Sequence, residues 1–174
     1  MRTFLFALSI TVLPHTTAWA GPSTETFDRL GQFVVGQQAP AIAGWRLDGS
    51  LFRSKTEIDG VHGLVVTFFQ TTCAPCVVGL PKILDAVKAT QGRYGVLMIN
   101  VGERPELVTP FLARYQLRGP VVVDATQALR DGLGLSDALP RTVVIGPDGV
   151  VRAALGEEGV DFLALLEHAM APAR

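Results

Sequence analysis

An apolar run, GLVVTFF at residues 63–69, constrains the fold most, because helical spacing begins only a few residues after it. Its length and its β-branched and aromatic residues are typical of a buried strand. From Cys73 onward, apolar side chains recur on one helical face until Gln91-Gly92 ends the pattern. Pro81 falls inside this helix and is expected to kink it. The pattern predicts a buried strand that leads directly into a helix.

The rest of the chain continues the alternation of strands and helices. Before the apolar run, a hairpin is expected around Asp48-Gly49. After the first helix, strands are expected at 95–101 and 120–123, separated by a helix from Pro105 to about Tyr115. The chain then continues with a short helix at 126–133, a hairpin of strands at 142–145 and 150–154, and a last helix at 160–170. In the helix that Pro105 opens, Leu107, Phe111 and Leu112 are expected to face inward. The predicted fold class is α/β, a three-layer sandwich with a mixed central sheet, helices on both faces and an N-terminal β-hairpin extension.

The first twenty residues have the features of a cleaved secretory signal peptide. Arg2 precedes an apolar run at 4–13, and Ala18-Trp19-Ala20 has the small residues that a signal peptidase accepts. A run of about ten residues is too short for a membrane anchor, which needs roughly twenty. The predicted organisation is a signal peptide at 1–20, a linker or N-terminal segment at 21–34 and one domain at 35–174. We therefore expect a periplasmic protein with no membrane span after cleavage.

Cys73 and Cys76 are the only two cysteines. A crosslink between residues this close removes little unfolded-state entropy, so a disulfide scaffold is excluded and stability must come from the hydrophobic core. The formal net charge of −1 and the absence of a basic run give no sign of a nucleic-acid partner. The pair is therefore available for chemistry.

The position of the pair favours redox chemistry. Cys73 is expected at the first turn of a helix, where free amides and the helix dipole favour a nucleophilic thiolate. Cys76 lies one turn further on and is expected to be more buried, so that it can resolve a mixed disulfide held on Cys73. Pro75 has a torsion preset for the first helical turn and holds the two sulfurs at bonding distance.

Metal binding is the main alternative for the pair. A zinc site needs two further Cys or His ligands, and after signal cleavage the chain offers only His62, in a predicted turn, and His168, near the end of the last helix. No metal and no cofactor are therefore predicted. Copper(I) needs only two thiolates and stays open as an alternative.

Several segments in order resemble the thioredoxin superfamily, in its TlpA/ResA-like branch of periplasmic thiol-disulfide oxidoreductases. VGQQAPAI at 35–42 is similar to the entry segment of that branch, and VVTFFQTTCAPC at 65–76 to its central strand and redox motif. Pro81 follows Cys73 by eight residues, as the helix proline of the family does, and LPRTVVIGPDGVV at 139–151 resembles its proline and terminal hairpin. The resemblance implies a thioredoxin-like fold.

The resemblance also implies roles for residues outside the cysteine pair. The Leu139-Pro140 peptide bond is expected to be cis and to face the sulfurs, leaving the backbone of Leu139 free to pair with a substrate. Glu103 is implied to exchange a proton with Cys76, and the alternative is that it caps the helix that follows.

Other positions depart from the family pattern. Thr72 stands where the family has tryptophan, Gly79 replaces a common glutamate, and Thr67 occupies the position of a buried aspartate in thioredoxins proper. Arg141 follows the proline where a small hydroxyl residue is frequent, and it is a candidate to stabilise the Cys73 thiolate. Thr72, Leu139 and Arg141 are predicted to contact the substrate.

Together these features predict an exported thiol-disulfide oxidoreductase that reduces disulfide-bearing partner proteins and receives its electrons from a membrane protein. The resemblance implies cytochrome c maturation as one destination. A Sco-like copper(I) carrier is an alternative, although that family separates its cysteines by three residues. A thiol peroxidase is another, but Val66 and Gln70 stand where its Pro-x-x-x-Thr-x-x-Cys pattern requires proline and threonine.

Overall fold

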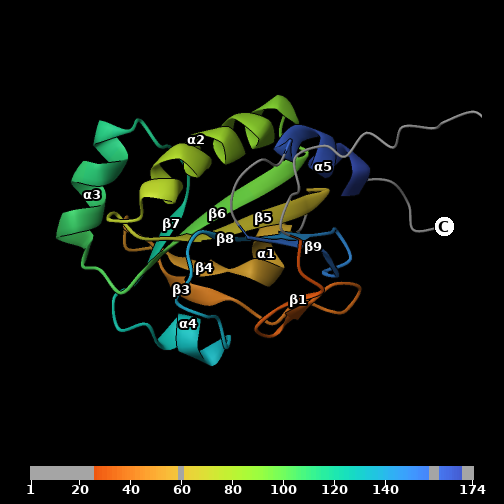
Figure 1. Ribbon diagram of the computed structural model, residues 1–174, viewed down its shortest axis with the longest axis horizontal. Coiled ribbons are helices and arrows are strands. Elements are labelled where there is room, and N and C mark those ends of the chain that lie inside the picture. The colour runs from red at the N-terminus through yellow and green to blue at the C-terminus, as the bar shows by residue number, and fades with distance from the viewer. Residues whose placement is uncertain (1–25, 59–60, 157–160, 170–174) are drawn as a thin grey trace, which may run out of the picture.

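A five-stranded mixed sheet forms the middle layer of the protein (Figure 1). The computed structural model describes residues 26–58, 61–156 and 161–169. The strands are β5 (Gly63–Phe69), β6 (Tyr94–Val101), β7 (Val121–Asp124), β8 (Arg141–Ile145) and β9 (Val151–Leu155), in the spatial order β7-β6-β5-β8-β9. β6 pairs with β5 and β7 in parallel, whereas β8 pairs antiparallel with β5 and β9. The predicted mixed sheet with a terminal hairpin is confirmed.

Strand β5 is central and buried along its whole length, as its continuous apolar run predicts. Alternate side chains enter different clusters. Leu64, Val66 and Phe68 belong to the core on one face, whereas Val65 and Phe69 pack on the other face. Both faces of the sheet are therefore covered by other elements.

One face is covered by three helices: α2 (Ala74–Ala89), α3 (Pro105–Arg114) and α5 (Phe162–Ala169) (Figure 1). α2 is a single helix that continues through Pro81. In α3, Val108 and Phe111 point inward, but Leu107 is 56% exposed, so the prediction that Leu107 faces the core is wrong. The inward face of the helix follows Val108 and Phe111, and Leu107 is turned about 100° away from its neighbour Val108.

The opposite face is covered by the short helices α1 (Ser54–Ile58) and α4 (Ala128–Gly132) and by two hairpins (Figure 1). The predicted hairpin at Asp48-Gly49 is present as β3 (Ala43–Trp45) and β4 (Leu51–Arg53). A second hairpin, β1 (Arg29–Leu30) and β2 (Phe33–Val34), lies inside the segment 21–34. Helices on both faces and an N-terminal hairpin thus agree with the predicted three layers.

Segments that precede β5 cover both edges of the sheet. At the β9 edge, the Phe27 amide donates to Ala154 at 2.8 Å and the Gly36 amide donates to Val151 at 2.9 Å. At the β7 edge, the Leu47 amide donates to the carbonyl of Val121 at 3.0 Å. Edge strands with unpaired amides would otherwise invite pairing with other chains.

The segment 26–34, part of the predicted linker or N-terminal segment at 21–34, contributes to the core. Leu30 and Phe33 are buried in the same cluster as Phe68. Strands of two residues are too short for hydrophobic periodicity to reveal. The predicted signal peptide and its cleavage site lie outside the described residues. In the part of the chain that is described, no helix combines the length and the apolar character needed to cross a membrane.

Candidate active site

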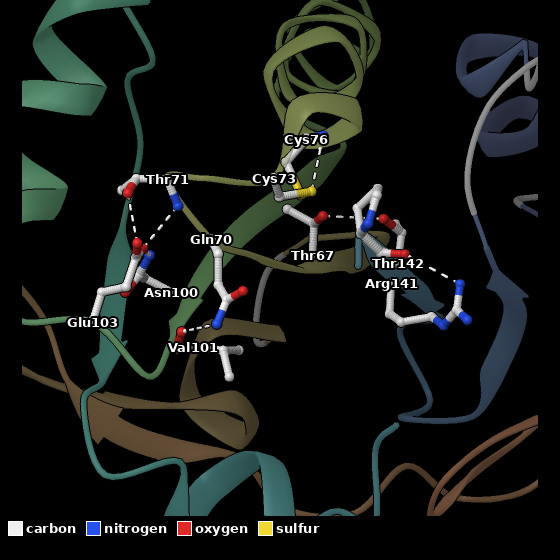
Figure 2. Close-up of a disulfide and its surroundings, with 11 residues drawn as sticks. Thr67, Gln70, Thr71, Cys73, Cys76, Asn100, Val101, Glu103, Arg141 and Thr142 are labelled. Atoms are coloured by element: carbon white, nitrogen blue, oxygen red, sulfur yellow. Dashed lines mark hydrogen bonds between the residues drawn. A yellow bond between two sulfur atoms is a disulfide. The ribbon is translucent and has the colours of Figure 1, made fainter. Parts of the chain in front are cut away.

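The two cysteines form a disulfide at the start of α2 (Figure 2). Cys73 is the N-cap residue of the helix and Cys76 lies in its first turn. The Cys76 amide donates a hydrogen bond to Sγ of Cys73 at 3.1 Å, and the Cα atoms are 5.2 Å apart. Ala74 and Pro75 occupy the first helical positions, where the missing amide of proline costs no helical hydrogen bond. The N-cap geometry thus directs one backbone amide at the sulfur of Cys73.

The two sulfurs have different environments. Cys73 is partly exposed, whereas Cys76 is completely buried and packs with Phe69, Leu80 and Val108. A partner protein can therefore reach Cys73 and not Cys76. This agrees with the expected order, in which Cys76 is the deeper cysteine.

The Leu139-Pro140 peptide bond is cis, as the resemblance implied. Pro140 is buried, and Leu139 is half-buried between two core clusters. The next residue begins β8 and pairs with Phe68, near the end of β5 that leads to the cysteines. The sheet register therefore places the proline beside the redox loop.

Arg141 and Thr72 occupy different surroundings. The Arg141 guanidinium lies 5.1 Å from the centre of the Phe27 ring, and one of its N–H groups donates to the carbonyl of Pro140 at 3.4 Å. Figure 2 shows this side chain pointing away from the disulfide. The structure therefore does not bring the guanidinium to the Cys73 sulfur. Thr72 is exposed directly before Cys73.

Glu103 is held by the loop that precedes the cysteines. Its carboxylate accepts from the Thr71 amide at 2.8 Å, from the Thr71 hydroxyl at 2.5 Å and from the Asn100 side-chain amide at 2.6 Å (Figure 2). Gly102, at φ +76°, turns the chain sharply after β6 and so brings Glu103 back toward this loop. No hydrogen bond among the described residues joins the carboxylate to either cysteine, and proton exchange with Cys76 stays a prediction.

Sequence reasoning missed the residues that fix this loop. Thr71 and Asn100 contact Glu103, and the Gln70 side chain donates to the carbonyl of Val101 at 3.0 Å. Asn100 is completely buried. The sequence did offer one signal for this contact, because Asn100 lies at the end of an apolar strand and three residues before Glu103.

A second polar pair lies in the central sheet. Thr67 on β5 and Thr142 on β8 are opposite each other in the register, and the Thr142 hydroxyl donates to the Thr67 hydroxyl at 3.1 Å. Both side chains are buried. In the sequence, Thr67 stands out only for the aspartate that it replaces, and nothing singles out Thr142.

Among the described residues, side chains that could bind a metal do not gather near the disulfide. Within residues 26–58, 61–156 and 161–169, no group of three or more His, Cys, Asp and Glu side chains is placed to hold a metal ion. His62 and His168 are both exposed. The site is thus built from two sulfurs, neutral hydroxyl and amide groups and one carboxylate.

Proteins with related sequences are named thiol-disulfide oxidoreductases. Thiol-disulfide oxidoreductase ResA of Geobacillus thermodenitrificans is 29% identical over 154 residues, which cover 87% of this chain and 83% of that protein. The protein of the same name from Halalkalibacterium halodurans is 30% identical over 119 residues, which cover 67% and 65%.

Solved structures share the fold. A putative thiol:disulfide interchange protein DsbE from Chlorobium tepidum matches with a TM-score of 0.69 at 19% identity, over 80% of this chain and 99% of that one. A thioredoxin-family thiol:disulfide interchange protein from Chlorobium tepidum TLS matches with a TM-score of 0.66 at 25% identity, over 78% and 97%. The thioredoxin-like fold is confirmed. Residues 35–154 match the family model described as the AhpC/TSA family, and the chain therefore belongs to that family.

Proposed function

We propose that this protein is an exported thiol-disulfide oxidoreductase that reduces disulfide bonds in partner proteins. The observation that carries the proposal is the asymmetry of the pair. Cys73 is partly exposed and its sulfur accepts an amide hydrogen bond at the start of α2, whereas Cys76 is completely buried behind it. The names of the related proteins describe thiol-disulfide chemistry.

The proposed reaction transfers two electrons from the dithiol to the partner. The Cys73 thiolate attacks one sulfur of the partner's disulfide, forms a mixed disulfide and releases the other sulfur as a thiolate. Cys76 then gives its proton to that first thiolate, attacks the Cys73 sulfur and releases the second partner sulfur as a thiolate, which is protonated by the solvent. The partner is reduced to a dithiol, and the protein is left with the Cys73–Cys76 disulfide.

The surface around Cys73 would bind the partner. Thr72 is exposed beside the sulfur, and Leu139 is half-buried before the cis proline, so its backbone is a candidate to pair with an extended segment. Arg141 would act at the margin of this surface, because its guanidinium lies over Phe27. We infer that Pro140 shapes the surface and that Glu103 holds the loop before Cys73 through Thr71.

The proposed cellular setting rests on the predicted signal peptide. A signal peptide at 1–20 would send the protein to the periplasm, where a reducing enzyme needs electrons from a membrane protein because the compartment holds no reduced thiol buffer. Cytochrome c maturation, in which apocytochrome cysteines must be reduced, is the process that the resemblance suggests.

Reduction of insulin disulfides by the dithiol form tests the activity directly. We expect Cys73→Ser to abolish it. Cys76→Ser should instead accumulate a mixed disulfide with the partner, visible as a covalent adduct on a non-reducing gel, and the Cys73→Ser variant is the control that should form none. An inactive wild-type protein, or adducts formed equally by both variants, would contradict the proposal.

The reduction potential tests the direction of electron flow. Equilibration of the Cys73–Cys76 couple with glutathione should give a strongly negative value. A potential of about −120 mV, typical of strongly oxidising thiol-disulfide enzymes, would show that the protein introduces disulfides instead.

A further inference from the structure

The Thr67–Thr142 pair lies on the face of the sheet that carries α2. Side chains alternate along β5, and Val65 packs with Ile83 of α2 whereas Phe69 packs with Cys76. Thr67 lies between these two positions on the same face. Figure 2 shows its side chain beside the disulfide, with Thr142 next to it. Two hydroxyl groups are thus buried in an otherwise apolar layer, beside the disulfide.

The hydrogen bonds of this pair leave one proton without an acceptor. Each hydroxyl has one proton to donate, and the bond of 3.1 Å between Thr142 and Thr67 uses only one of the two. Among the described residues, neither hydroxyl has another hydrogen-bond partner. A buried donor without an acceptor is unfavourable, and a thiolate at Cys76 would supply one, directly or through a single water.

Among residues 26–58, 61–156 and 161–169, no charged side chain is placed to supply this hydrogen bond instead. The Glu103 carboxylate is occupied by Thr71 and Asn100, and the Arg141 guanidinium lies over Phe27. On the neighbouring helices, Lys82 is exposed, and the Tyr115 ring packs against Phe111. The amide of Cys76 itself points at the other cysteine, Cys73.

We propose that the Thr67–Thr142 hydroxyl pair donates a hydrogen bond that stabilises the Cys76 thiolate during the second step of the reaction. This inference rests on the proposed function for its role in turnover. The hydroxyl keeps its own proton and only orients it, while the proton lost by Cys76 goes to the partner thiolate released in the first step. The pair is a positioning device, because it acts on the ionisation of Cys76 and not on the partner.

The test measures the ionisation of Cys76 alone, in a Cys73→Ser background. Ultraviolet absorbance of the thiolate gives the pH midpoint of its formation. We expect Thr67→Val, which keeps the shape and removes the hydroxyl, to lower the thiolate fraction at neutral pH about tenfold, the effect of one lost hydrogen bond to a charged group. Thr67→Ser, which restores the hydroxyl, should return the midpoint to that of the parent.

Thr90→Val is the matched control. Thr90 is buried at the other end of α2, where its hydroxyl donates to the carbonyl of Val87 at 2.6 Å and accepts from the Tyr94 amide at 3.2 Å. This variant also loses a buried hydroxyl, and we expect it to leave the Cys76 midpoint unchanged. If Thr67→Val does not fold, Thr67→Ala is measured in the same way.

With both cysteines present, the release of the partner from a preformed mixed disulfide gives the rate of the second step. Thr67→Val should slow it about tenfold at neutral pH, and by less as the pH rises. An unchanged midpoint in a folded Thr67→Val or Thr67→Ala variant would overturn the inference, as would a Thr67→Ser midpoint shifted as far as that of Thr67→Val. Because the midpoint needs no partner, a shifted midpoint in a protein that fails to reduce insulin would overturn the proposed function alone.

Discussion

Glu103 shows how a single residue can fix a redox loop without touching the sulfurs. Its carboxylate accepts three hydrogen bonds, two from Thr71 and one from Asn100. Asn100 is buried, and its side-chain amide has the carboxylate as its acceptor. Loss of the negative charge would therefore weaken the connection between the end of β6 and the loop before Cys73.

We predict that Glu103→Gln lowers the free energy of unfolding by about 1–2 kcal/mol, because hydrogen bonds to a charged group contribute about 1.5–3 kcal/mol and this group is partly exposed. Urea denaturation measures the change. Glu167→Gln, at an exposed position of α5, is the control and should change stability by less than about 0.5 kcal/mol. Equal losses in the two variants would show that the three bonds contribute nothing measurable.

The same variant separates the two roles of Glu103. If the carboxylate exchanges a proton with Cys76, Glu103→Gln changes the pH profile of insulin reduction. If it only holds the loop, the variant is less stable but keeps the wild-type profile. From the hydrogen bonds described above we expect the second result.

At the scale of the helix, α2 carries a glycine, Gly79, that has room for a larger side chain. A Cβ at Gly79 would meet no heavy atom within 4 Å, and helical glycine is less favourable than alanine by roughly 0.5–1 kcal/mol. We predict that Gly79→Ala stabilises the protein by about that amount in urea denaturation.

Gly102→Ala provides the contrasting case. Its φ of +76° is costly for any residue with a side chain, and a new Cβ would lie 3.0 Å from the side-chain nitrogen Nε2 of Gln127. This variant should destabilise the protein. A stabilising effect at both glycines would refute the distinction between open helical space and a required turn.

Strand β6 is joined to α5 by a buried tyrosine. Tyr94 donates its hydroxyl proton to the carbonyl of Leu166 at 3.3 Å. Burial raises the pKa of the Tyr94 phenol above its usual 10.0, an effect that Arg152 and Arg93 partly offset. The folded state therefore holds this proton more tightly than the unfolded chain does. The resulting stability is fully present below pH 10.0 and is lost as the pH rises toward the higher pKa of the folded state.

We predict that Tyr94→Phe is less stable than wild type by about 0.5–1.5 kcal/mol near neutral pH, through the lost hydrogen bond. The difference should shrink as the pH rises above 10.0, because only the wild-type protein has this phenol to ionise. Urea denaturation over a series of alkaline pH values measures it. A difference that stays constant with pH would mean that the phenol is not linked to folding.

At the scale of the whole molecule, the N-terminal segment belongs to the core. Phe33 is completely buried and its ring lies 6.3 Å from that of Phe68 in the central strand. We predict that Phe33→Ala costs about 3–5 kcal/mol, the range for a large buried aromatic side chain. Val35→Ala, at a side chain that is 40% exposed, should cost far less. A small loss for both, measured by urea denaturation, would mean that this segment is only loosely attached.

Most of the sheet and the redox pair could be predicted from the sequence, because long apolar runs and a Cys-x-x-Cys motif between strand and helix are local signals. The contacts of Glu103 with Thr71 and of Thr142 with Thr67 could not, because they join residues that are distant in the chain and depend on the sheet register. The hairpin β1–β2 could not be predicted for a different reason, because strands of two residues are too short to show hydrophobic periodicity.

The covering of β9 by the segment around Phe27 sets an order of events in biosynthesis. Phe27 leaves the ribosome long before Ala154, yet its amide finds its acceptor only there. The first described residues can therefore form this hydrogen bond only after β9 has been synthesised, and pairings between distant parts of a chain slow folding. A chain truncated before β9 would therefore leave the Phe27 amide without this acceptor.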